Sequence, residues 1–174
     1  QVLLKGAESL STRYKDHIGV IRSWDFNRAV WQYPVIIDNM MNLELLEWAS
    51  KNSDNSRFAA IARSHADVTL KNHFRADYSC WHVVSYDTIT GQPEKKHTRQ
   101  GYSHESSWSR GEAWALYGYV MMYRETQQKH YLVHAKKVAN YILTHPRMPE
   151  DGIPYWDYDA PDLSLIHISE PTRP

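Results

Sequence analysis

The sequence predicts a mainly helical fold with one β-like insert. Apolar residues recur at helical spacing in five segments of the 174-residue chain, and this periodicity is the primary sequence signal for helices. A stretch near the middle, residues 80–101, is instead rich in β-branched and turn-forming residues. With 42% hydrophobic residues, the chain is long enough to bury a core of its own.

The first two expected helices flank an irregular connection. The chain begins at Gln1, and residues 2–14 already have a helical apolar pattern. Residues 15–33 lack such a pattern and are expected to form a connection rich in aromatic residues. A second helix is expected to begin at Pro34, because a proline costs no hydrogen bond in the first turn. Its apolar positions follow at helical spacing and are Ile37, Met40, Met41, Leu45 and Trp48.

Three further helices are expected in the rest of the chain. The third follows Asp54 or Asn55 as its cap, since short polar side chains accept hydrogen bonds from the first N–H groups of a helix. The fourth begins near Ser106, and the fifth occupies residues 131–142 and ends before Pro146.

Residues 80–101 are expected to form a hairpin or a long loop laid over the helices. Residues 81–87 are β-prone, and residues 90–93 (Thr-Gly-Gln-Pro) have the composition of a turn. Long loops on a rigid scaffold often carry functional residues, so this insert is a candidate part of a site.

Composition excludes several kinds of partner. Lys+Arg and Asp+Glu both number 20, so the formal net charge is zero and nucleic acid is not expected to bind. No apolar stretch is long enough to span a membrane. Cys80 is the only cysteine, which excludes an internal disulfide and a cysteine metal site. The aromatic content of 13% includes seven Trp and twelve Tyr, and such amphipathic rings suit sugar binding or a Tyr-rich core.

Asp38 is the main candidate for acid–base chemistry. It lies between residues 36–37 (Ile-Ile) and 40–41 (Met-Met), and burial among apolar side chains raises the pKa of a carboxyl toward the range of a general acid. An acidic residue soon after Pro34 also stabilises a helix N-terminus, and the residues alone favour this structural role.

Arg110 and Trp114 are four residues apart on the fourth expected helix and therefore share a face. An arginine there can grip a carboxylate beside an aromatic wall, or its stem can simply pass a buried tryptophan. Gly111 costs a helix about 1 kcal/mol relative to alanine, which indicates the close approach of another group. His82 and Gln100, both in the insert, are each more typical of structural positions when taken alone.

No metal site is expected. His130 and His134 have a metal-compatible spacing, but no third ligand is evident, and an exposed helix face is the expected structure there. No segment matches a phosphate-binding loop, a zinc-protease helix or a nucleophile elbow.

The C-terminal tail has no sequence relation to the residues before it. Residues 163–174 resemble the in-frame translation of an adaptor used in sequencing libraries, so we expect them to be foreign to the protein. Residues 1–162 are then expected to be an internal piece of a longer protein.

Three stretches resemble one enzyme family when they are taken together. They are Ile21–Asp25, Pro34–Leu43 and Gln100–Gly118, and the closing segment Ile153–Asp159 fits the same pattern. Their order and length resemble the unsaturated glucuronyl hydrolases of glycoside hydrolase family 88. The resemblance covers residues 1–162.

The resemblance implies an all-α (α/α)6 double-toroid barrel, of which this chain would be an open arc. It also implies a glycosidase without a metal or organic cofactor. The substrates would be oligosaccharides that end in a 4,5-unsaturated uronic acid, left by lyases that act on glycosaminoglycans. In this family an Asp protonates C4 of the vinyl ether and assists water attack at C5, and the resulting hemiketal collapses to release the sugar.

Six positions acquire roles from this resemblance. Asp38 matches the general acid/base, and His82 matches a pocket histidine that helps to place the water or the uronate. The remaining pocket positions are Trp24, Gln100, Arg110 and Trp114. A second essential Asp of the family would precede Gln1, so this chain alone is expected to be inactive.

The chain departs from the family pattern at three positions. His104 replaces an expected acidic residue, and Ser107 and Glu112 replace the commoner Ala and Gln, which leaves substrate preference open. A close alternative is an unsaturated rhamnogalacturonyl hydrolase, with the same barrel and chemistry but acting on pectin fragments. An alternative of a different class is a non-catalytic helical scaffold that binds sugar or protein through its aromatic face.

Overall fold

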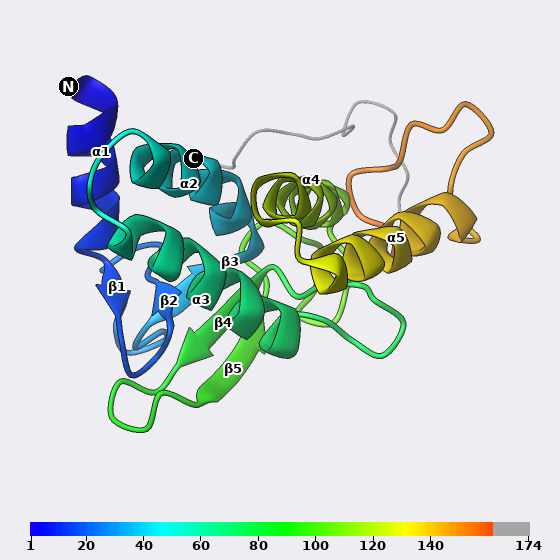
Figure 1. Cartoon of the computed structure of the whole chain (residues 1–174). Coiled ribbons are helices and arrows are strands. Elements are labelled where there is room, and N and C mark those ends of the chain that lie inside the picture. Colours follow the sequence, from blue (N-terminus) through cyan, green and yellow to red (C-terminus); the bar gives the residue numbers. More distant parts are fainter. Residues whose placement is uncertain (162–174) are drawn as a thin grey trace.

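Helices make up most of the described chain. The computed structural model describes residues 1–161, so the tail expected to be foreign lies outside the described residues. The helices are α1 (Val2–Ser11), the 3₁₀ helix η1 (Ile37–Asn42), α2 (Leu43–Lys51), α3 (Arg57–Asn72), α4 (Ser109–Thr126) and α5 (Lys129–Thr144) (Figure 1). The mainly helical class is confirmed for this part of the chain, and no helix in it is long and apolar enough to cross a membrane.

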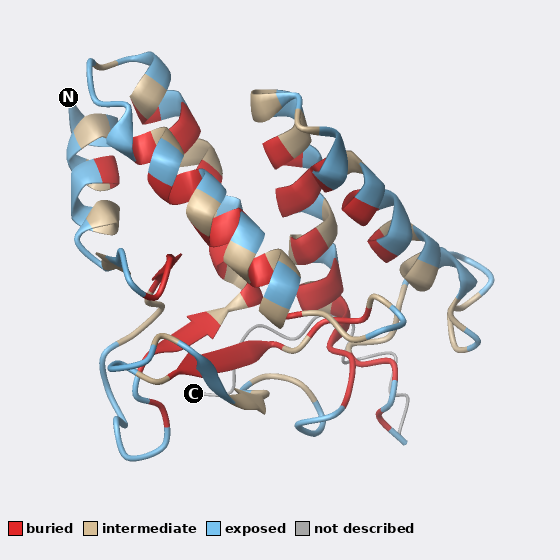
Figure 2. Ribbon diagram, turned by 60° about the horizontal axis from the view of Figure 1, so that its bottom comes forward, coloured by how far each residue is buried: buried red, intermediate tan, exposed pale blue. Residues whose placement is uncertain are grey.

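A three-stranded antiparallel sheet packs against the helices (Figures 1 and 2). Its order is β3 (Pro34–Ile36), β4 (Val83–Tyr86) and β5 (Pro93–His97), and the last two strands form the hairpin expected within residues 80–101. A shorter antiparallel pair, β1 (Tyr14–Lys15) and β2 (Val20–Ile21), lies at the start of the connection that was expected to be irregular.

The expected helix start at Pro34 is wrong. Residues 34–36 form strand β3, in which Val35 lies opposite Val84, and the helical turn begins only at Ile37. A proline is tolerated on an edge strand such as β3, and the β-branched residues that follow it favour a strand. The apolar spacing did not reveal this strand because its partner lies far away in the sequence.

The other boundaries follow their local signals with small shifts. The N-cap of α3 is Ser56 and not Asp54 or Asn55 as expected, although Asn55 Oδ1 accepts the backbone N–H of Arg57 at 3.1 Å. Helix α4 begins at Ser109, later than expected, because the backbone of Trp108 is extended and forms a β-bridge with Asp157. Helix α5 ends before its proline, as expected.

The main core forms where η1, α2, α3, α4 and α5 meet, and Figure 2 shows the buried residues on the inward faces of these helices. Two glycines let α4 approach η1 closely. A Cβ on Gly118 would lie well inside 3.0 Å of Met40 Cβ, and one on Gly111 would lie 3.3 Å from Ile37 Cγ2, both in η1. The close approach indicated by Gly111 is thus confirmed, and η1, which carries Asp38, is set directly against α4.

His134 faces the core, and the expectation of an exposed face there is wrong. Its side chain is buried, with ring centroids 4.2 Å from Phe74 and 4.6 Å from Tyr119. His130 is exposed and lies 3.1 Å from Asp67. Residues four apart differ by about 40° around a helix, which is enough to separate core from solvent at the margin of a packed face.

Candidate active site

Asp38 lies in the first turn of η1, directly after strand β3. Its side chain is 21% exposed, and its Oδ2 atom is buried without a hydrogen-bond partner among the described residues. Burial raises the pKa of Asp38 to about 6, although its own backbone N–H and the charge of Arg110 act in the opposite direction. The desolvated carboxyl expected from the apolar flanking residues is confirmed.

His82, the residue before β4, faces Asp38 with a defined tautomer. Its Nδ1 accepts the backbone N–H groups of Arg99 (3.1 Å) and Gln100 (3.2 Å), so the neutral ring must carry its proton on Nε2. Nε2 lies 3.7 Å from Asp38 Oδ2. Burial, followed by the charges of Arg110 and Arg99, lowers the pKa of His82 to about 3. The contact is therefore a neutral N–H facing a carboxyl and not an ion pair.

Trp108 joins the histidine to the arginine. Its ring lies 4.5 Å from the His82 ring, and the guanidinium of Arg110 lies 4.7 Å from the centre of the same indole. Arg110 also donates from Nη2 to Gln100 Oε1 at 3.3 Å. The structure thus brings four predicted site residues into one connected group, which are Asp38, His82, Gln100 and Arg110. Apart from its place two residues before Arg110, no sequence feature distinguishes Trp108 from a core tryptophan.

Trp24 belongs to an aromatic cluster in the connection before β3. Its ring stacks on Phe26 (5.6 Å between centroids, 22° between planes) and meets Trp31 edge-on at 5.3 Å. The guanidinium of Arg99 lies 5.7 Å from the Trp24 ring and 5.3 Å from the Phe26 ring. Because the backbone of Arg99 is bonded to His82, this cluster adjoins the connected group.

Trp114 is separate from this group in its contacts. It lies one turn after Arg110 on α4, and its ring meets Tyr117 edge-on with 6.4 Å between centroids. Within residues 1–161, no ring contact or hydrogen bond joins Trp114 to Asp38 or His82. Its place in the pocket stays a prediction, based on the helix face that it shares with Arg110.

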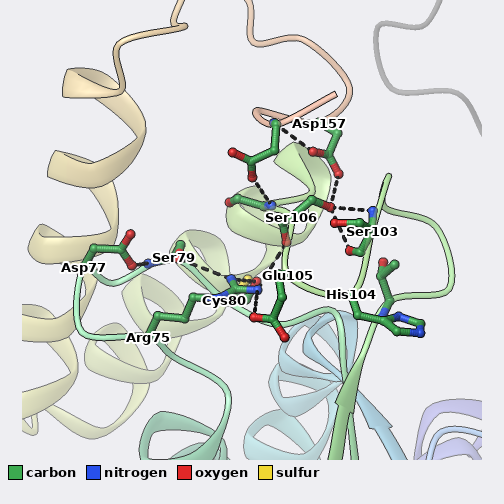
Figure 3. A network of polar contacts seen from close by, with 12 residues as sticks. Arg75, Asp77, Ser79, Cys80, Ser103, His104, Glu105, Ser106 and Asp157 are labelled. Carbon is green, nitrogen blue, oxygen red and sulfur yellow. Dashed lines mark hydrogen bonds and ion pairs between the residues drawn. The ribbon is translucent and has the colours of Figure 1, made fainter. Parts of the chain in front are cut away.

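A buried carboxylate holds the loop that carries Gln100. Asp157 Oδ2 accepts the hydroxyl of Ser106 at 2.8 Å (Figure 3). The same oxygen accepts the backbone N–H of Tyr102 at 2.8 Å. From the other side, Arg75 donates to the carbonyl of Ser106 at 3.4 Å. This network fixes the loop relative to α4, and with it the N–H groups that define the histidine tautomer.

A second buried carboxyl, Glu112, lies behind the group on α4. Its Oε1 accepts the backbone N–H of Cys80 at 2.7 Å and the hydroxyl of Ser107 at 2.8 Å, whereas Oε2 is buried without a partner among the described residues. Burial raises the pKa of Glu112 to about 7. This geometry suits a neutral side chain, which agrees with the Gln that the family pattern favours at this position.

A cavity of about 360 Å³ lies elsewhere, beside the C-terminal end of α5. Its lining includes Arg75, Asp77, Tyr141 and His145, and it includes none of the six predicted site residues. The candidate site is therefore defined by connected side chains and their electrostatics, not by this cavity.

The described residues offer no ready metal centre. Within residues 1–161, no three His, Cys, Asp or Glu side chains are grouped so that they could hold an ion. Cys80 is buried, and burial raises the pKa of its thiol, so it is not poised as a nucleophile.

Sequence and structure comparisons agree on one group of relatives, although no protein-family model matches the chain. An unsaturated glucuronyl hydrolase of Formosa agariphila is 50% identical over 163 residues, which are 94% of this chain and 41% of that protein. An unsaturated chondroitin disaccharide hydrolase of Streptococcus agalactiae is 36% identical over 90% of this chain and 39% of that protein. A crystal structure of an unsaturated glucuronyl hydrolase specific for heparin aligns with a TM-score of 0.88 and 50% identity, covering 91% of this chain and 42% of that structure.

The chain is a homologue of the unsaturated glucuronyl hydrolases. The family resemblance carried by the motifs around Asp38 and Arg110 is thereby confirmed. The chain spans about two fifths of the length of these curated unsaturated glucuronyl and chondroitin disaccharide hydrolases. Since the match to the Formosa agariphila enzyme covers 163 of 174 residues, the connected group lies inside the matched length.

Proposed function

We propose that the protein that carries this chain hydrolyses lyase-generated glycosaminoglycan oligosaccharides and releases their terminal 4,5-unsaturated uronic acid. The main supporting observation is Asp38, whose pKa of about 6 is combined with the Nε2–H of a neutral His82 at 3.7 Å. One relative is named for chondroitin disaccharides, and one related structure is described as specific for heparin. These names support glycosaminoglycan fragments as the substrate class.

In the proposed reaction, Asp38 gives its proton to C4 of the vinyl ether, and positive charge develops at C5. Water adds to C5 and returns a proton to the Asp38 carboxylate, and the resulting hemiketal collapses with release of the sugar. A carboxyl with a pKa of about 6 suits both roles, because it can lose and regain a proton near neutral pH. The Nε2–H of His82 donates to the water or to the uronate.

Arg110 is proposed to bind the uronate carboxylate. Its guanidinium is held over Trp108, and an arginine stacked on an aromatic face still directs N–H donors outward in its own plane. Trp24 and Trp114 are proposed as aromatic walls of the pocket, and Gln100 as a hydrogen-bonding side chain oriented by Arg110. No metal or organic cofactor takes part in this proposal.

The complete barrel is part of the same proposal. We propose that residues 1–162 belong to an (α/α)6 catalytic domain and that residues 163–174 are foreign. The packed helix pairs α2–α3 and α4–α5 and the TM-score of 0.88 support this architecture. A second catalytic carboxylate is proposed to come from another part of the domain.

The test is the Asp38→Asn variant of the protein expressed from the complete open reading frame that encodes this chain. We expect turnover to be lost with the fold intact, because asparagine has the same shape and Asp38 Oδ2 has no partner to lose among the described residues. Turnover is followed by the loss of ultraviolet absorbance of the conjugated uronate. Asp16→Asn, at an exposed carboxylate on the surface, is the matched control. Near-normal rates in Asp38→Asn would refute the assignment.

The same assay separates the alternatives. Faster hydrolysis of an unsaturated rhamnogalacturonan disaccharide than of glycosaminoglycan disaccharides would favour the pectin-fragment enzyme. Binding of the disaccharides without turnover in the unmodified protein would favour a non-catalytic scaffold.

A further inference from the structure

We propose that Arg99, lying on the rings of Trp24 and Phe26, forms a subsite for an anionic group on the part of the substrate that leaves. This inference rests on the proposed function, because it assigns the binding partner of the sugar next to the unsaturated ring. The anionic group is a sulfate on the leaving sugar or the carboxylate of a further uronate.

The two rings form a platform under the guanidinium. They stack with 22° between their planes, and Arg99 is within 6 Å of both centroids. Phe26 is 52% exposed, so the platform lies at the surface, where a ligand can reach it. A guanidinium has its N–H donors in its own plane, and this planar fork matches the oxygens of a sulfate or carboxylate.

The charge of Arg99 is not neutralised by the surrounding side chains. Among the described residues its guanidinium has these two ring contacts and no hydrogen bond or ion pair to a carboxylate. Arg22 and Arg28, in the connection that carries the platform, instead both bind Asp25 at 2.8–2.9 Å. Arg99 therefore remains available as a receptor for an anion.

The position of Arg99 relative to the proposed acid defines which part of the substrate it meets. Its backbone N–H is bonded to Nδ1 of His82, and Nε2 of the same ring faces Asp38. One imidazole ring thus separates the backbone of Arg99 from the carboxyl that would protonate the substrate. An unsaturated ring bound at Asp38 would lie on the Nε2 side of the His82 ring. The next sugar would then be the part of the substrate within reach of the Arg99 side chain.

The experiment compares substrates with and without an anionic group beyond the unsaturated ring, using the protein from the complete open reading frame. One arm pairs an unsaturated uronate–N-acetylglucosamine disaccharide with its 6-sulfated form. The other arm pairs the neutral-ended disaccharide with an unsulfated tetrasaccharide that carries a further uronate. Arg99→Met keeps the hydrophobic contact with the platform but removes the charge. Arg57→Met removes a surface arginine paired with Asp16 and is the matched control.

We expect Arg99→Met to lower the ratio of kcat/KM for the anionic to the neutral substrate about tenfold in at least one arm, as expected for the loss of a charge-assisted hydrogen bond. The arm that responds identifies the sulfate or the carboxylate as the source. Arg57→Met should leave both ratios unchanged. An unchanged ratio in Arg99→Met, or an equal loss for charged and neutral substrates, would overturn the subsite.

Failure of the proposed function gives a different result from failure of the subsite. If the unmodified protein turns over none of these substrates, the hydrolase proposal fails, and calorimetric binding of the same ligands to the same variants then tests the subsite. A loss of about tenfold in affinity for the anionic ligand alone supports it, as above. Equal affinities for the anionic ligand in Arg99→Met and the unmodified protein refute it.

Discussion

Replacing Gly118 with alanine should push η1 away from α4. The new Cβ would lie well inside 3.0 Å of Met40 Cβ and 3.1 Å from Met40 Cε. Rotation of the Met40 side chain cannot relieve the first contact, because Cβ is attached directly to the backbone of η1. Overpacking costs about 1–3 kcal/mol, and alanine recovers about 1 kcal/mol in a helix interior. Because the contact is with an immobile atom in a buried core, we expect a net loss of about 2 kcal/mol in the free energy of unfolding.

The same displacement should reduce activity. Asp38 lies two residues before Met40 in η1, so it moves with the helix. A shift of about 1 Å in a reacting group can cost about 100-fold in rate. Urea unfolding followed by tryptophan fluorescence measures the stability, and kcat/KM on an unsaturated disaccharide measures the placement of the acid.

Gly6→Ala is the matched control for this prediction. The nearest atom to a Cβ at Gly6 is Leu45 Cδ2 at 3.6 Å, an ordinary van der Waals contact, so alanine in α1 should gain about 1 kcal/mol. If Gly118→Ala were stabilised as much as Gly6→Ala and kept its kcat/KM, the argument from close helix approach would be wrong.

Three other predictions follow from the site. If Asp38 is the acid, kcat/KM should fall as pH rises through about 6, since only the protonated carboxyl donates, and a flat profile between pH 5 and 8 would contradict this. The pKa of Glu112 is about 7 in the folded protein against an ordinary value of 4.5, so the free energy of unfolding falls as pH rises from 4.5 to 7. Glu112→Gln should therefore raise the free energy of unfolding by about 3 kcal/mol at pH 8 and change it little at pH 4, as measured by urea unfolding. Trp108→Leu removes the ring between His82 and Arg110 and should lower kcat/KM at least about tenfold, with Trp108→Phe less affected, and equal losses in the two variants would argue against a supporting role for the ring.

Features that depend on neighbouring residues could be predicted from the sequence. The helical segments, the hairpin of β4 and β5 and the stop of α5 all follow from spacing, turn residues and proline. The raised pKa of Asp38 also agrees with the sequence, because the apolar residues on both sides of Asp38 indicated a buried carboxyl. The close approach at Gly111 could be inferred from a glycine in a helix interior.

Features that depend on distant residues could not be predicted in this way. The strand at Pro34 exists because β4, far along the chain, pairs with it. His134 is buried because Phe74, which follows α3, and Tyr119, on α4, pack around it. The position of Trp108 between His82 and Arg110 likewise depends on the packing of His82, the residue before β4, against its ring.

By itself, the sequence determined the mainly helical class, the family resemblance and the identity of Asp38 as the candidate acid. Only the tertiary structure decided that His82 carries its proton on Nε2 and faces that acid, because the two N–H groups that fix its tautomer belong to a loop about 17 residues later, at Arg99 and Gln100. The tautomer and the desolvation of His82 depend on partners that folding brings together, so they cannot be predicted from the residues next to it in the chain.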